Sequence, residues 1–150
     1  MKIAIGNDHS GVALKRELTE YMESLGHTVI NFGTDTTESV DYAVYAEKVA
    51  RAVVGGQCDR GVLICGTGLG ISIAANKIRG VRCAHCTESC TTELSRRHND
   101  ANIVAVGARI IGPELAKDLV KTFLETGFEG GRHARRVGLI AKLENGETLS

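Results

Sequence analysis

A cysteine followed by a glycine-rich turn is the strongest chemical signal in the sequence. Residues 65–70 (CGTGLG) follow an apolar run and open directly into a helical pattern. Backbone N–H groups in such a turn bind anions, and a positive helix terminus lowers the pKa of a nearby thiol. A thiolate beside an anion nest can remove a proton and stabilise the resulting oxyanion. The alternative is that Cys65 is a small buried hydrophobe, as most free cysteines are.

Asp8 and His9 form a second group that could do chemistry, within residues 6–11 (GNDHSG) after the first apolar run. Ligands of open α/β sheets bind at the carboxyl ends of the strands, so a carboxylate and an imidazole here can serve a reaction. The alternative is structural, with Asp8 capping the next helix and His9 on the surface. Nucleotide-binding motifs are absent, because residues 6–11 lack G-x-G-x-x-G and no Gly-Lys-Ser/Thr follows the turn at 65–70.

His98 and Asn99 stand at the end of a helical pattern, just before the fifth apolar run. Arg96 and Arg97 precede them. Cations at a helix C-terminus complement the helix dipole, which accounts for the two arginines without any function. This account covers His98 less well, and His98 with Asn99 fits an acid–base group beside a hydrogen-bonding amide.

Arginines near the C-terminus indicate a phosphate site. Arg132 and Arg136 are four residues apart and therefore share one face of the last predicted helix. Arg109 follows the fifth apolar run. The planar guanidinium group suits phosphate oxygens, although a solvated charged face would give the same pattern. Two glycines precede the last helix and no strand follows it, which favours a helix that docks outward.

Three cysteines between residues 83 and 90 invite a metal-site interpretation. Cys83, Cys86 and Cys90 have the spacing C-x2-C-x3-C, with His85 between them, and no second ligand pair follows at a suitable distance. The set also begins in a predicted strand and ends in a predicted helix, which separates the thiols. We therefore expect no metal site, and the odd total of five cysteines predicts free thiols instead of disulfides.

Short apolar runs alternate with helical patterns along the whole chain, which predicts βαβ units around a parallel sheet. The five predicted strands are Lys2–Gly6, Thr28–Phe32, Gly61–Cys65, Val81–His85 and Asn102–Val106. The six predicted helices span about 14–25, 42–53, 71–78, 88–97, 113–126 and 132–143.

Local signals place several ends of these helices. Gly26 fits the position after the first helix, and Thr87 is the predicted N-cap of the fourth. Pro113 fits the first turn of the fifth helix, which Gly127 is expected to end. Together these elements predict one doubly wound α/β domain over residues 1–150.

Composition excludes several classes of protein. Lys plus Arg and Asp plus Glu number 18 each, so the net charge is zero, which argues against non-specific binding to nucleic acid or anionic membranes. The first residues, MKIAIGNDHSG, contain no secretory apolar segment, and no apolar run approaches membrane-spanning length. The sequence predicts a cytoplasmic protein.

These segments together resemble the type B ribose-5-phosphate isomerases and their galactose-6-phosphate and allose-6-phosphate isomerase relatives. The likeness covers about residues 1–144 in the same order and spacing. The matching stretches are GNDHSG (6–11), ESVDY (38–42), ICGTGLGISIAANK (64–77), LSRRHNDAN (94–102) and EGGRH (129–133).

The resemblance implies how the glycine-rich turn would work. Cys65 would move a proton between C1 and C2 of the sugar, because Leu69 occupies the place of the glutamate that does this in some relatives. Backbone N–H groups would hold the enediolate oxygen, with help from the hydroxyl of Thr67. The glycines of the turn are Gly66, Gly68 and Gly70.

The resemblance also implies roles for residues outside that turn. His98 and Asp8 would open the furanose ring, while Asn99 and Tyr42 would hold nearby hydroxyl groups. The phosphate group would be bound by His9, Arg132, Arg136 and Arg109.

A Rossmann-like three-layer fold and an isomerase of the pentose phosphate pathway follow from the same resemblance. The reaction needs a base, an oxyanion stabiliser and a ring-opening group, so we expect no metal or redox cofactor. Members of the family form dimers or tetramers with sites built from two chains, which would explain an outward last helix.

Two departures from the family pattern bear on the choice of sugar. Ala43 replaces a usual proline, which affects loop stiffness. The stretch Val81–Cys90 carries extra cysteines and lacks a usual proline–tyrosine pair, which alters the expected pocket wall. A six-carbon sugar 6-phosphate isomerase is therefore the main alternative, and a non-catalytic sugar-phosphate sensor is the alternative from another class.

Overall fold

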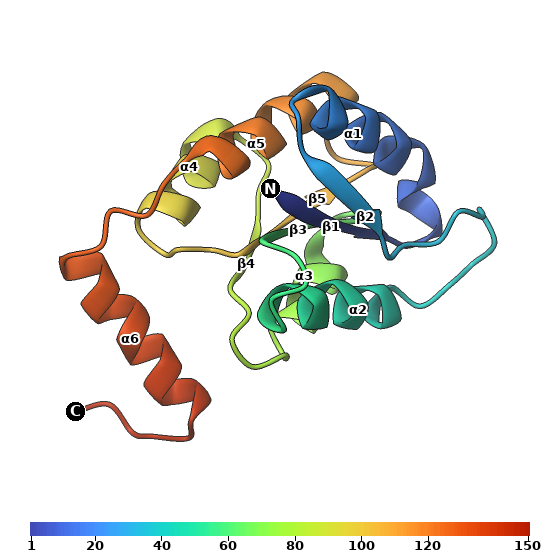
Figure 1. Cartoon of the computed structure of the whole chain (residues 1–150). Helices are drawn as coiled ribbons and strands as arrows, with labels where there is room; N and C mark the ends of the chain where they lie inside the picture. Colours follow the sequence, from blue (N-terminus) through green and yellow to red (C-terminus); the bar gives the residue numbers. More distant parts are fainter.

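A five-stranded, all-parallel sheet forms the centre of the protein (Figure 1). The computed structural model describes all residues from 1 to 150, and the strand order is β2-β1-β3-β5-β4. The parallel sheet and its five strands are confirmed, and only β4 is clearly shorter than predicted. The strands are β1 (Lys2–Asn7), β2 (Thr28–Asn31), β3 (Arg60–Cys65), β4 (Cys83–His85) and β5 (Ile103–Gly107).

Helices cover both faces of the sheet and make a three-layer domain (Figure 1). One face carries α1, α4 and α5, and its apolar core includes Leu18, Val104 and Phe123. The other face carries α2 and α3, with Val49 and Ile71 in its core. The helices are α1 (Val12–Ser24), α2 (Tyr42–Val54), α3 (Leu69–Ala75), α4 (Ser89–Arg97), α5 (Pro113–Glu125) and α6 (Arg132–Glu144), and a short 3-10 helix, η1 (His9–Gly11), precedes α1.

Three of the predicted helix ends are confirmed and one is wrong. Gly26 has the expected positive φ of 88°, and Pro113 is the first residue of α5. The N-cap of α4 is Glu88 and not Thr87, because the Glu88 carboxylate accepts the first free N–H groups of the helix. Helix α5 ends at Glu125 with Thr126 as its C-cap, so Gly127 directly follows the helix, as predicted.

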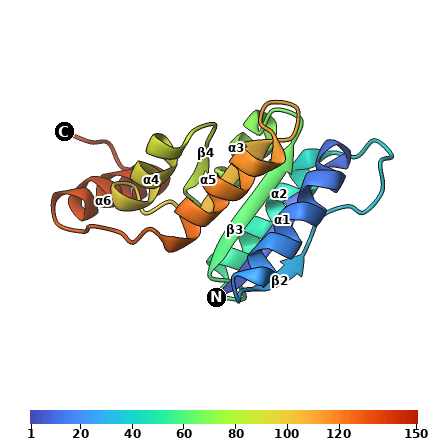
Figure 2. The ribbon, with the colours of Figure 1, turned by 90° about the horizontal axis from the view of Figure 1, so that it is seen from above.

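Helix α6 projects away from the domain beyond the β4 edge of the sheet (Figures 1 and 2). Only His133 of this helix is buried, and Ile140 and Leu143 are exposed. At its far end the helix returns to its own chain through Glu144, whose carboxylate accepts the N–H of Gly80 at 2.9 and 3.1 Å. Neither α6 nor any other helix is long and apolar enough to cross a membrane.

Candidate active site

The thiol of Cys65 lies at the carboxyl end of β3, where the glycine-rich turn begins. Cys65 is paired in register with Gly107 of β5 and is only 4% exposed. The backbone N–H of Gly68 donates to its Sγ atom at 3.1 Å. Gly68 has a φ of 82°, and a Cβ there would lie 2.6 Å from the ring of His85, so only glycine fits. The turn therefore brings a backbone donor onto the sulfur.

Several backbone N–H groups of the same turn are free to bind a ligand. The N–H of Leu69 bonds to the hydroxyl of Thr67 at 3.2 Å. Those of Gly66, Thr67 and Gly70 have no acceptor within the chain. Helix α3 begins at Leu69, two residues earlier than predicted, so the turn passes into the helix without a linker. Free donors beside a sulfur atom fit the stabilisation of an oxyanion.

Asp8 and His9 follow the carboxyl end of β1, which lies beside the carboxyl end of β3 because the two strands pair directly and in parallel. The N–H of Asp8 donates to the carbonyl oxygen of Ile64 at 3.1 Å. The structural interpretation of Asp8 is confirmed, since its buried carboxylate accepts the N–H of Ser10 and caps the 3-10 helix. His9 is half-buried, and its Nδ1 accepts the N–H of Val40 at 3.2 Å. Both residues are thus held at the end of the sheet where Cys65 lies.

Tyr42 and Arg109 both lie against the glycine-rich turn. A Cβ at Gly70 would lie 2.7 Å from the Tyr42 ring, and one at Gly66 would lie 3.3 Å from the Arg109 guanidinium. The two glycines therefore let these side chains approach the backbone. We call Asp8, His9, Tyr42, the segment 65–70 and Arg109 the thiol half-site.

Sequence reasoning missed His85 as a neighbour of the thiol half-site. Its Nε2 lies 2.8 Å from the carbonyl oxygen of Thr67. The contact arises because β4, which ends at His85, pairs with β5, and only β5 separates it from β3. The only sequence signal was a histidine at the end of a predicted strand, and the strand order was needed to place it.

A second group of predicted site residues assembles where α4 ends and α6 begins. His98 caps the end of α4, and its ring stacks on that of His133 with centroids 4.1 Å apart. Asn99 is exposed beside it, and Arg132 and Arg136 are exposed on the first turns of α6. We call these five residues, with Glu129, the imidazole half-site.

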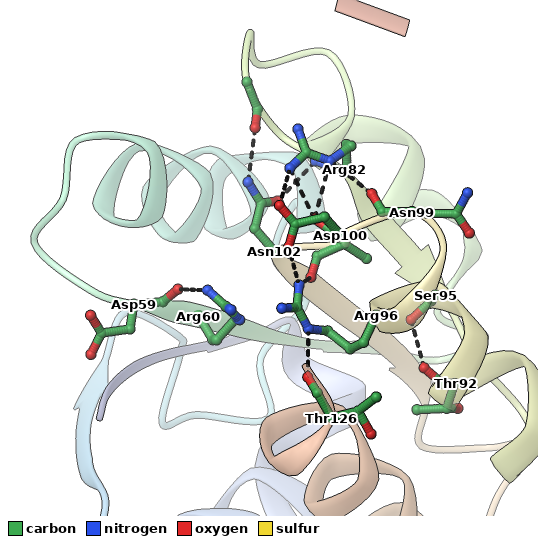
Figure 3. A network of polar contacts seen from close by, with 12 residues as sticks. Asp59, Arg60, Arg82, Thr92, Ser95, Arg96, Asn99, Asp100, Asn102 and Thr126 are labelled. Carbon is green, nitrogen blue, oxygen red and sulfur yellow. Dashed lines mark hydrogen bonds and ion pairs between the residues drawn. The ribbon is translucent and has the colours of Figure 1, made fainter. Parts of the chain in front are cut away.

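A polar network holds the turn after His98 (Figure 3). Asp100 has a φ of 46°, which only a few side chains tolerate. Its carboxylate bonds to Arg82 at 3.1 Å and to Arg96 at 2.8 Å. Arg96 is almost fully buried and also donates to the carbonyl oxygens of Ala101 and Thr126. These contacts fix the backbone that presents the imidazole half-site.

The two half-sites of one chain lie toward opposite ends of the strands. Asn102, just after the imidazole half-site, accepts the N–H of Gly61 near the start of β3. Cys65 ends the same strand, so about 15 Å of extended chain separates the two levels. The predicted pairing of Asp8 with His98 is therefore not formed within one chain. Residues 66–70, His9, Tyr42 and Arg109 lie near Cys65, whereas Asn99, Arg132 and Arg136 lie with His98.

The residues most suited to a metal ion are in the imidazole half-site. The ligating atoms of His98, Glu129 and His133 all lie within 4.8 Å of one another. The two rings are nearly parallel, with 6° between their planes, so their lone pairs do not converge on one point. Arg97 also bonds to the Glu129 carboxylate at 2.6 Å. The arrangement fits a stacked pair better than a metal centre. The three cysteines at 83, 86 and 90 differ in burial, from buried to exposed.

Comparison of the sequence and structure with known proteins shows the family to which the chain belongs. The sequence pattern of the ribose/galactose isomerases matches residues 3–140. The chain belongs to the ribose/galactose isomerase family. Ribose-5-phosphate isomerase B of Escherichia coli is 50% identical over 143 residues, which cover 95% of this chain and 96% of that one.

Other members of the family show the same likeness. D-erythrulose-4-phosphate isomerase of Pectobacterium atrosepticum is 40% identical over 98% of this chain and 97% of its own. The structure of ribose-5-phosphate isomerase B from Clostridium thermocellum has a TM-score of 0.96 and 56% identity, covering 97% of this chain and 99% of that one. The Rossmann-like fold of this ribose/galactose isomerase is therefore shared with solved members of the family.

Proposed function

We propose that this protein interconverts ribose 5-phosphate and ribulose 5-phosphate through an enediolate intermediate. The observation that carries the proposal is the Cys65 thiol beside free N–H groups of the glycine-rich turn. A base and oxyanion donors at one point are what exchange between an aldose and a ketose requires. Leu69 cannot act as a base, which leaves the proton transfer to Cys65.

The proposed reaction begins with opening of the furanose ring. His98 removes the proton of the anomeric hydroxyl group, the bond between C1 and the ring oxygen breaks, and Asp8 on the opposite side passes a proton to the ring oxygen, which becomes the C4 hydroxyl group. Asn99 and Tyr42 bind nearby hydroxyl groups. The thiolate of Cys65 then removes the proton from C2 of the open aldehyde, and the aldehyde oxygen becomes the enediolate oxygen.

Return of that proton to C1, together with transfer of the hydroxyl proton from O2 to the charged O1, gives the ketose. The negative charge on the oxygen is held by the N–H groups of Gly66, Thr67 and Gly70, with the Thr67 hydroxyl beside them. The electron pair never leaves the substrate, so the step is balanced without an electron acceptor.

The phosphate group would be held from two sides. His9 and Arg109 belong to the thiol half-site, and Arg132 and Arg136 are exposed cations with no ion pair in the chain. Guanidinium groups in this arrangement bind phosphate oxygens with paired hydrogen bonds. Four donors would fix one end of the sugar while the other end reacts.

We further propose that two chains build each site in a homodimer. The half-sites lie too far apart in one chain to act on one sugar, and a two-fold axis that joins unlike half-sites gives two equal sites. Exposed apolar side chains surround the thiol half-site, and an apolar groove of about 530 Å³ lies between α6 and the β4 edge. Exposed apolar surface of this kind marks an interface. The exposed apolar side chains within or next to the thiol half-site are those of Tyr42, Val44, Leu69, Ile73 and Ile110.

Residues 1–150 act in this proposal as one domain, and the reaction belongs to the pentose phosphate pathway in the cytoplasm. The choice of sugar depends on the wall formed by the end of β4, where His85 contacts the glycine-rich turn. This wall lies in the stretch that departs from the family pattern, and the relative from Pectobacterium acts on a four-carbon sugar phosphate by its name. We therefore include six-carbon sugar 6-phosphates among the substrates to be assayed.

The purified protein, with a chelator present, should convert ribose 5-phosphate to ribulose 5-phosphate with a kcat of about 1–10³ s⁻¹. The measurement is a coupled or direct absorbance assay, run in parallel on allose 6-phosphate, galactose 6-phosphate and erythrose 4-phosphate. Activity on another of these sugars and not on ribose 5-phosphate would change the substrate. Binding of these sugar phosphates without turnover would contradict the proposed enzymatic function and would support a non-catalytic sugar-phosphate sensor.

A further inference from the structure

His133 is a buried histidine that the proposed reaction does not use. Its side chain is 7% exposed, whereas that of His98, the ring it stacks on, is 35% exposed. The planes of the two rings differ by only 6°. One face of His98 is thus covered by a fixed ring, and the rest of the imidazole stays open to a ligand.

Glu129 fixes the same pair from the side. Its Oε2 lies 3.4 Å from the Nε2 of His133 and 3.9 Å from the Nε2 of His98. Its other oxygen is bound by Arg97, whose Nε donates at 2.6 Å, and its backbone N–H donates to the carbonyl oxygen of Arg97 at 3.0 Å. The connection between α5 and α6 is therefore attached to the end of α4 at the residue just before His98 (Figure 1).

The charges around His133 favour its neutral form. Burial lowers the pKa of His133, and His98, Arg132 and Arg136 lower it further, while Glu129 opposes them. Arg97 neutralises much of the Glu129 charge. His133 is therefore neutral near neutral pH, and it covers His98 without placing a charge against it.

A ring-opening group needs a defined orientation more than extra charge. His98 stands at a helix end and is partly exposed, so its ring would otherwise turn between rotamers. Loss of a near-attack orientation of about 1 Å can cost about 10²-fold in rate. A stacked neighbour that is itself buried removes this freedom.

We propose that His133 is a positioning residue for His98, and that its stacked ring holds the His98 imidazole in the plane from which it opens the sugar ring. This inference rests on the proposed isomerase function. It also links two parts of the site, because His133 shares the first turns of α6 with Arg132 and Arg136. When α6 binds the phosphate group of the sugar through its arginines, it therefore also orients His98, the ring-opening group.

The test compares a substrate that has a ring with one that has none. Ribulose 5-phosphate cannot close to a furanose, because its C5 oxygen carries the phosphate, and the aldehyde formed from it can close in solution after release. For His133→Ala we expect kcat on ribose 5-phosphate to fall by about 10–10²-fold, with KM changed much less. The initial rate of ribulose 5-phosphate consumption should stay within about threefold of wild type.

Two more variants separate positioning from a structural role. His133→Phe keeps a flat ring at the stack and should restore most of the lost kcat on ribose 5-phosphate. In a His98→Asn background, His133→Ala should have no further effect on that rate, because the two residues act through one group. Arg135→Ala, an exposed change on the same turn of α6, serves as the control and should leave both rates unchanged.

Equal losses in both directions, or no loss in either, would overturn the positioning role. An additional loss from His133→Ala in the His98→Asn background would do the same. Wild-type protein that is inactive in both directions would instead overturn the proposed function. If His133→Ala does not fold, His133→Phe provides the test. A kcat of His133→Phe on ribose 5-phosphate as low as that of His98→Asn would show that His133 supplies more than a stacked ring, and would overturn the positioning role.

Discussion

The Cys65→Ala variant should lose about 10³-fold or more of kcat in both directions of the reaction, while KM changes little. The sulfur is the only base at the end of β3, and a positioned base contributes about 10²–10⁴-fold to a proton transfer. Alanine keeps the buried position filled and leaves the glycine-rich turn free to bind the sugar. Steady-state kinetics with ribose 5-phosphate and with ribulose 5-phosphate measure the loss.

Cys90→Ala is the matched control, because Cys90 is an exposed thiol at the start of α4, away from the glycine-rich turn. It should retain wild-type kinetics. Thermal unfolding of both variants checks that they fold. A folded Cys65→Ala protein that keeps more than about a tenth of wild-type kcat would show that another group moves the proton.

The His98→Asn variant should lose about 10²–10³-fold of kcat on ribose 5-phosphate and far less on ribulose 5-phosphate. Only the first substrate has a ring to open, and asparagine keeps a polar side chain of similar size while removing the titratable group. Initial rates in the two directions, measured with the same preparation, give the ratio directly.

His27→Asn provides the matched control for that substitution, since His27 lies beside the N-terminus and far from both half-sites. Its rates should equal those of the wild type in both directions. If His98→Asn instead slows both directions to the same extent, His98 takes part in the proton transfer at C1 and C2, and the assignment of ring opening to it fails.

Much of the fold follows from local sequence patterns. The apolar run that ends at Cys65 and the glycines after it predict a strand that passes into a helix, and this is what β3 and α3 form. Pro113 and Gly26 mark helix ends because their backbone preferences leave few other positions. Glu88 was missed because a glutamate side chain is a less common N-cap than the neighbouring threonine.

The composition of the site is harder to read from one sequence. The residues of the thiol half-site follow strands that are neighbours, so the rule for strand ends groups them correctly. His98 and Asp8 belong to different ends of the sheet, and no local pattern shows that a pair of this kind must be completed by a second chain. The stack of His98 on His133 joins the end of α4 to the start of α6, and only the path of the intervening chain brings them together.

A mixture of two inactive variants tests the shared site most directly. Cys65→Ala and His98→Asn chains are co-expressed with different tags, or unfolded together and refolded, and assayed with ribose 5-phosphate against each variant alone. If each site takes its thiol half-site from one chain and its imidazole half-site from the other, mixed dimers hold one intact site. Random pairing then restores about a quarter of wild-type activity. Activity that stays at the average of the two separate variants would contradict the two-chain site.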